Sequence, residues 1–181
     1  DGGSILNSGS IYASADASYS SSASAFAYGI NVGTLASGGS ITNSGTIEAD
    51  ADASETAVAN AFGINVKTLE SGGSISNSGT IYASASASET AVANAFGINV
   101  KTLESGGSIS NSGTIYASAY ASSSSAFAYG INVGTLASGG SITNSGTIDA
   151  DADASYSSSA SAFAYGINVG TLASGGSITN S

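Results

Sequence analysis

Strict alternation of small apolar and polar residues is the dominant pattern of this chain. Residues 47–53 read Ile-Glu-Ala-Asp-Ala-Asp-Ala, so in an extended strand the apolar residues share one face and the acidic residues share the other. Residues 57–66 alternate as well, and no stretch has a helical period. Runs equivalent to the first begin at Ile11, Ile81, Ile115 and Ile148. The pattern predicts β-strands throughout.

A Gly-Gly pair marks an internal repeat of this pattern. Its second glycine recurs at intervals of 33 to 36 residues, at Gly3, Gly39, Gly73, Gly107, Gly140 and Gly176. The repeats cover approximately residues 3–38, 39–72, 73–106, 107–139 and 140–175, followed by a partial one. Repeats of this length made only of strands predict an all-β parallel β-solenoid (β-helix) of about five coils. One coil per repeat is the favoured interpretation, and two shorter coils per repeat are the alternative.

Stacked coils place equivalent residues in columns along the solenoid axis. One predicted column is isoleucine and includes Ile41, Ile75, Ile109 and Ile142. A second column is aromatic and includes Phe62, Phe96, Tyr129 and Tyr165. A third is a structural ladder of amides, whose side chains bond coil to coil, at Asn43, Asn77, Asn111 and Asn144. Columns of inward alanine predict two closely packed sheets, and hence a flattened, Ala-rich core.

A longer identity lies behind the short repeat. Residues 15–44 are identical to residues 152–181, so the last segment of the chain repeats an early one. We interpret residues 1–181 as a single array. It is either a window of a longer array or a unit whose ends are satisfied by neighbouring copies.

Composition excludes several classes of function. The chain has no Cys, His, Met, Trp or Pro, only two Lys or Arg residues, and 12 Asp or Glu residues for a net charge of -10. Without thiols or imidazoles it lacks the usual zinc and haem ligands and the commonest general bases. Two cations cannot neutralise a phosphate backbone. We therefore expect no enzyme activity, no cofactor and no nucleic-acid partner. No apolar run is long enough to predict a membrane span.

Two strands carry three carboxylates each on one face. The trios are Glu48, Asp50 and Asp52, and Asp149, Asp151 and Asp153. Such trios are weak candidates for Ca²⁺ binding, or for an acid and base pair in a glycan-cleaving solenoid. A solvated strand face is the simpler interpretation, because the neighbouring coils carry mostly Tyr and Ser at these positions. We therefore assign no metal site.

Four tyrosines are predicted to lie on the outward face of the same strands. They are Tyr12, Tyr82, Tyr116 and Tyr120. Exposed aromatic rings can stack on sugars or mediate lateral association, so these residues form a candidate interface. Glu48 and Asp149 interrupt the column, which argues against a continuous platform.

The repeated Ser-Ile-Thr-Asn-Ser-Gly-Thr-Ile, followed by alternating Ala and later by Tyr/Phe-Gly-Ile-Asn-Val, resembles the passenger repeats of bacterial autotransporters and related surface adhesins. The resemblance covers essentially the whole chain. It implies a parallel β-helix, usually right-handed, that is exported to the cell surface. The chain has neither the Gly-x-Ser-x-Gly nor the His that the family's protease members would need.

Together these observations predict a structural protein at the bacterial cell surface or in the extracellular matrix. We expect a rod, a stalk or an end-to-end stacked filament whose partner is another copy of itself. The alternative is an adhesin whose Tyr- and Ser-bearing face contacts a glycan or a host receptor.

Overall fold

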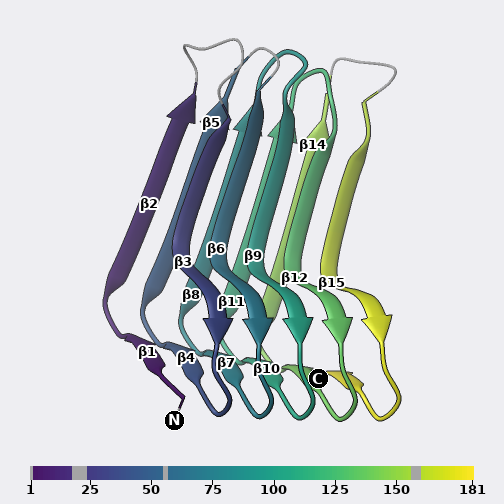
Figure 1. Ribbon diagram of the computed structural model, residues 1–181. Coiled ribbons are helices and arrows are strands. Elements are labelled where there is room, and N and C mark those ends of the chain that lie inside the picture. Colours follow the sequence, from purple (N-terminus) through teal and green to yellow (C-terminus); the bar gives the residue numbers. More distant parts are fainter. Residues whose placement is uncertain (1, 18–23, 55–56, 156–159) are drawn as a thin grey trace.

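The chain folds into stacked coils made only of β-strands. The computed structural model describes residues 2–17, 24–54, 57–155 and 160–181, and every regular element within these ranges is a strand. Figure 1 shows the coils side by side, from the N-terminal coil at the left (purple) to the C-terminal coil at the right (yellow). The predicted all-β parallel solenoid of about five coils is thus confirmed. Each repeat supplies three strands to three different sheets, so one repeat is one coil and the alternative of two coils is wrong.

Three parallel sheets run the length of the solenoid. Sheet A is six-stranded and consists of β1 (Ser4–Asn7), β4 (Ser40–Asn43), β7 (Ser74–Asn77), β10 (Ser108–Asn111), β13 (Ser141–Asn144) and β16 (Ser177–Asn180). Sheet B is five-stranded and consists of β2 (Ser10–Ala17), β5 (Thr46–Ala53), β8 (Thr80–Ala87), β11 (Thr114–Ala121) and β14 (Thr147–Ala154). Sheet C is five-stranded and consists of β3 (Ala25–Leu35), β6 (Val58–Leu69), β9 (Val92–Leu103), β12 (Ala126–Leu136) and β15 (Ala162–Leu172).

Strand pairing follows the sequence repeat without a slip. Ile41 of β4 pairs with Ile5 of β1 on one side and with Ile75 of β7 on the other. The same in-register pairing holds in sheets B and C, so each side chain meets the equivalent side chain of the next coil. A one-residue slip would turn the apolar face of a strand outward, and for this reason the buried face fixes the register.

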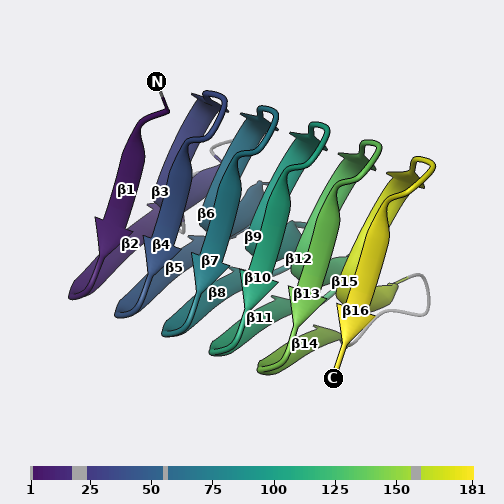
Figure 2. The same cartoon turned by 90° about the horizontal axis from the view of Figure 1, so that it is seen from below.

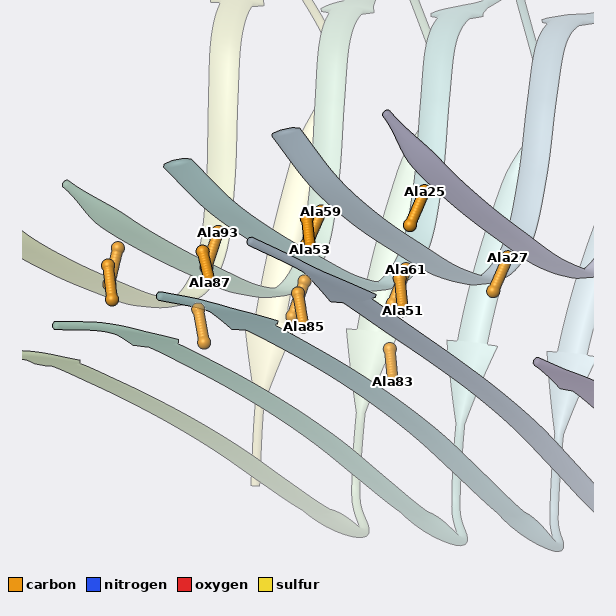
Figure 3. Close-up of a cluster of buried hydrophobic side chains, with 14 of the residues drawn as sticks. Ala25, Ala27, Ala51, Ala53, Ala59, Ala61, Ala83, Ala85, Ala87 and Ala93 are labelled. Carbon is orange, nitrogen blue, oxygen red and sulfur yellow. The ribbon is translucent and has the colours of Figure 1, made fainter. Parts of the chain in front are cut away.

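The core has a narrow part and a wide part. Sheets B and C face each other across a cluster made only of alanine, and Figure 3 shows Ala51 and Ala53 of β5 beside Ala59 and Ala61 of β6. Nearer sheet A the core consists of Ile, Leu and Val instead, and the central side chains there are fully buried. Figure 1 shows the strands of sheets B and C diverging toward this wider part. Side-chain volume therefore sets the taper of the cross-section.

A glycine divides each long strand of sheet C. Ala61 and Gly63 are buried with a half-exposed Phe62 between them, yet the next residue, Ile64, is buried as well. The prediction of uninterrupted alternation over residues 57–66 is therefore wrong at this point. A Cβ atom on Gly63 would lie 2.3 Å from Cγ2 of Ile81 and 2.7 Å from the carbonyl oxygen of Gly97. Only glycine allows the backbone to change faces here.

Sheet A closes the wide part of the core through short strands and tight turns. Figure 2 shows these strands in front, with the N- and C-termini at opposite ends of the stack. Sheets C and A are joined by a turn in which Gly39 N–H donates to the Ala36 carbonyl oxygen at 2.8 Å. Gly38 has a φ of 70° in this turn, and the equivalent glycines of the other coils are also left-handed. A residue with a side chain would be strained there.

Candidate interaction surfaces

The four asparagines predicted to form a ladder are buried, each at the end of its sheet A strand. Asn77 Nδ2 donates to Asn111 Oδ1 at 2.7 Å, and the same bond joins every pair of neighbouring coils from Asn7 to Asn180. Asn77 Nδ2 also lies 3.2 Å from the Gly79 carbonyl oxygen. No buried side-chain polar atom of the described residues lacks a hydrogen-bond partner. From Asn43 to Asn111 this ladder is internal structure, because solvent and ligands do not reach it there.

A second amide ladder lies on the outer face of sheet C. Its members are Asn31, Asn65, Asn99, Asn132 and Asn168, joined by hydrogen bonds of 2.7 to 2.9 Å. Here each amide donates toward the N-terminal end of the solenoid, whereas in the buried ladder it donates toward the C-terminal end. Because these residues are half exposed, their remaining N–H and oxygen sites are open to a partner.

An uninterrupted aromatic ladder lies beside it on the same outer face. Tyr28, Phe62, Phe96, Tyr129 and Tyr165 stack with ring centroids 4.8 to 5.1 Å apart and interplanar angles of 3 to 7°. The rings are half-buried or exposed rather than part of the core. Burial and the neighbouring Tyr165 raise the pKa of the Tyr129 hydroxyl, which therefore stays neutral at physiological pH.

A third column on sheet C mixes phenylalanine and asparagine. It contains Phe26, Asn60, Asn94, Phe127 and Phe163. Phe127 and Phe163 stack with centroids 5.1 Å apart, and Asn94 Nδ2 donates to Asn60 Oδ1 at 3.1 Å. Both lysines of the chain, Lys67 and Lys101, are exposed on sheet C strands, and these strands contain no Asp or Glu.

The outer face of sheet B has the opposite character. It carries seven of the 12 acidic residues: Asp16, Glu48, Asp50, Asp52, Asp149, Asp151 and Asp153. Of the four tyrosines predicted to form an interface, only Tyr82 and Tyr116 stack, with centroids 5.0 Å apart. Tyr12 pairs with Glu48, and Tyr120 lies between Ser86 and Asp153 in another column. The four therefore do not share one surface column.

The two carboxylate trios lie on strands that are not neighbours. β8 and β11 separate β5 from β14, so the trios are roughly 14 Å apart along the axis. Burial raises the pKa of Asp52, and the nearby Asp50 and Asp16 carboxylates raise it further, while a hydrogen bond from Ser86 acts the other way. Among the described residues no group of three or more Asp, Glu, His or Cys side chains is arranged to hold a metal ion.

A hollow opens at the C-terminal edge of the solenoid. It has a volume of about 480 Å³, and Asn144, Ile148, Ile167 and Asn180 are among its lining residues. Ile148 and Ile167 belong to the isoleucine columns of the core, and they are only partly buried because no coil covers them. The hollow lies at the last described coil, and its lining is of the kind that meets between coils elsewhere in the solenoid.

The sequence analysis did not predict that the aromatic ladder lies on the outer surface of the solenoid. It predicted that the rings would stack but could not place them relative to solvent. Ahead of the repeated Gly-Ile-Asn-Val, Asn60 and Phe62 face outward because they alternate with the buried Ala59 and Ala61. Gly63 then changes which positions are buried. Alternation counted from Ala59 would have placed Phe62 outside, and with it Phe26 and Phe127.

Searches against protein-family models, curated proteins and solved structures return no match for this chain. The class that the coordinates define is therefore that of the fold, a parallel β-solenoid with three strands per coil. Within the described part of the chain no helix is long and apolar enough to cross a membrane.

Proposed function

We propose that this protein is a structural, non-enzymatic repeat protein that forms a rod, a stalk or an end-to-end filament outside the bacterial cell. The observation that carries the proposal is the unbroken register of three parallel sheets over all coils. Hydrogen bonds parallel to the axis in three ladders resist extension together. The resemblance of the repeats to autotransporter passengers supports a location at the cell surface and a structural role at that surface.

End-to-end association is supported by the chemistry of the two end coils. The outer edges of β14 and β15 have no neighbouring strand among the described residues, and unpaired edges favour further pairing. β3 has the same sequence as β12 and as β15. A second copy whose β3 lies on β15 would repeat the pairing that β12 makes with β15, ring on ring and Asn on Asn.

Sheet A adds one condition to this stacking. It has six strands while sheets B and C have five, and β16 already occupies the position that β1 of the next copy would take. Continuous pairing between two copies therefore requires that either β16 of one copy or β1 of the other leaves its place in sheet A. β16 is the easier to displace, because all four of its residues are exposed.

Electron microscopy of the purified chain over a concentration series tests the proposal. Stacked copies should form filaments with an axial rise of about 24 Å per chain, five coils of about 4.8 Å each. A chain ending at Ser174, which lacks β16, should form longer filaments at the same concentration. Short particles of one length at every concentration, for both chains, would contradict end-to-end assembly.

An adhesin is the second candidate function, favoured by the stacked Tyr82 and Tyr116 on sheet B. Ser84 and Ser118 lie two residues further along the same strands and add hydroxyl groups that could bond a sugar. Replacing both tyrosines by Ser should abolish binding on a glycan array or to host cells while the circular dichroism spectrum stays unchanged. Retained binding would exclude this face as the site.

A further inference from the structure

We propose that the outer face of sheet C is a lateral docking surface for a second copy of this chain. We call this surface the aromatic face and define it by two columns of sheet C. They are Tyr28, Phe62, Phe96, Tyr129 and Tyr165, and Phe26, Asn60, Asn94, Phe127 and Phe163. The inference is independent of end-to-end stacking, because it concerns the side of the solenoid and not its ends.

The aromatic face leaves large aromatic side chains at least partly exposed in every coil. In the central coils, where neighbouring coils lie on both sides, Phe62, Phe96 and Tyr129 are half exposed. The five stacked rings extend this surface over every coil, and no polar residue interrupts their column. Contiguous exposed apolar surface on a soluble protein marks an interaction site. Because the rings cover one another's faces, their edges form the accessible ridge, which suits packing against another sheet better than stacking on sugars.

Charge distribution selects the way in which two copies can approach. With a net charge of -10, copies repel one another at long range. The outer face of sheet B holds seven carboxylates, whereas the strands of sheet C hold none. Sheets B and C pack on each other through the Ala core, so their outer faces point in opposite directions. Contact between two aromatic faces therefore places both acidic faces outermost, where their repulsion is weakest.

Axial spacing favours a second copy over a partner of another kind. The rings repeat every 4.8 to 5.1 Å, and another coil of this protein repeats at the same interval. Two such faces can interdigitate at every coil, as paired sheets do in steric zippers. A contact between identical faces is also closed by a two-fold axis, the commonest symmetry of protein dimers.

The outer face of sheet C as a whole, of which the aromatic face is one part, has the area of a stable dimer interface. A strand of 11 residues spans roughly 36 Å and five strands span roughly 24 Å, so sheet C offers roughly 870 Å² per copy. Interfaces of standard size bury about 800 Å² per partner. The layer in front in Figure 1 is this sheet, and no other element of the described chain covers it.

The test compares two double variants that each remove two stacked rings from the central coils. Phe62→Ser with Phe96→Ser removes rings from the aromatic face, and Tyr82→Ser with Tyr116→Ser removes them from sheet B as a matched control. Sedimentation velocity measures association, and small-angle X-ray scattering measures the cross-sectional radius of gyration. The wild-type protein and the control should both widen with concentration. The aromatic-face variant should associate at least about tenfold more weakly, as expected for truncated central aromatics.

A charge variant keeps the test independent of ring packing. Asn60→Asp retains an oxygen that accepts from Asn94 and adds a negative charge to the aromatic face. An outward Asp is compatible with a strand of this solenoid, because β5 of sheet B carries two of them. It should weaken lateral association, and added salt should restore it. Wild-type particles whose cross-section stays that of one solenoid up to about 1 mM would overturn the proposal. Equal loss of association in the two Ser double variants would overturn it as well.

Failure of end-to-end stacking would look different in the same experiments. Stacking lengthens a particle and leaves its cross-section unchanged, whereas lateral docking doubles the cross-section and leaves the length unchanged. The truncation at Ser174 should alter only the length of the particles. The Phe62 and Phe96 double variant should alter only their cross-section. Each proposal can therefore fail while the other stands.

Discussion

The side-chain amide of Asn77 donates to the side-chain oxygen of Asn111 one coil further on, at 2.7 Å, and both residues are buried. The oxygen of Asn77 accepts the equivalent bond from Asn43. These bonds join the coils inside the molecule, where no water can replace a missing partner. The buried asparagine of each coil thus depends on the neighbouring coils for its hydrogen-bond partners.

Replacing Asn77 by Ala should lower the free energy of unfolding by about 2–4 kcal/mol, because buried polar partners lose their hydrogen bonds. Asn99→Ala is the control, since Asn99 belongs to the half-exposed outer ladder and water can take its place. We expect the control to cost less than about 1 kcal/mol. Urea denaturation followed by circular dichroism measures both. Equal losses would show that burial does not distinguish the two ladders.

Gly63→Ala should destabilise the protein by several kcal/mol or prevent folding. The added methyl group would approach Cγ2 of Ile81 to 2.3 Å and the carbonyl oxygen of Gly97 to 2.7 Å, and the backbone oxygen cannot rotate away. Gly33→Ala is the control, because nothing lies within 4 Å of its Cβ position. We expect the control to be neutral or slightly stabilising. Thermal denaturation of both variants provides the measurement.

Ala85→Leu should destabilise the protein by about 1–3 kcal/mol or more, because the gap between sheets B and C is filled by alanine and cannot accept a larger side chain. Ser84→Leu places the same side chain one residue earlier on β8, where it points outward. Its effect on the unfolding free energy should stay within about 0.5 kcal/mol, as for surface substitutions in general. A well-tolerated Ala85→Leu would mean that the sheets can separate.

Asp52→Asn should stabilise the protein at pH 7, by less than about 1 kcal/mol because the site is largely solvated. Burial and the Asp50 and Asp16 carboxylates raise the pKa of Asp52 above its usual 3.8, so the folded state binds this proton more tightly than the unfolded state. The wild-type protein therefore loses stability as the pH rises from 3.8 through the raised pKa. The advantage of Asn should shrink as the pH falls through this window and vanish below it.

Replacing Ser86, a neighbour of Asp52, should change stability at pH 7 in the opposite direction. The hydrogen bond from Ser86 lowers the pKa of Asp52 and so stabilises the charged carboxylate. Ser86→Ala should accordingly reduce stability at pH 7 and have little effect at pH 3, as measured by urea denaturation at the two pH values. A loss that persists at low pH would assign the effect of Ser86 to packing instead of charge.

Repetition is the reason that so much of the fold could be predicted. Because Ile41, Ile75 and Ile109 recur at the same place in every repeat, stacking them is the arrangement that buries all of them at once, and the structure pairs them so. The strands of sheet B were predictable for the same reason, since Ala49 and Ala51 alternate with Asp50 and Asp52. The buried amide column follows from Asn77 and its equivalents having the same position relative to the Gly-Gly pair.

The facing of sheet C could not be predicted in the same way. Its strands contain no strict alternation, because Gly63 changes the buried face from odd to even positions within one strand. The aromatic rings before that glycine and the asparagines after it both point outward, although they are separated by an odd number of residues. A backbone kink of this kind depends on how closely Ile81 and Gly97 pack against the glycine.

The sequence by itself determined the class of fold, the number of coils and the residues that meet between coils, because a repeated pattern of apolar residues has few ways to bury itself. The tertiary structure alone decided which columns of sheet C face outward, and hence that aromatic rings lie on the face opposite to the carboxylates of sheet B. That decision depends on how three sheets close around a tapered core, where alanine sets the width at one end and isoleucine at the other.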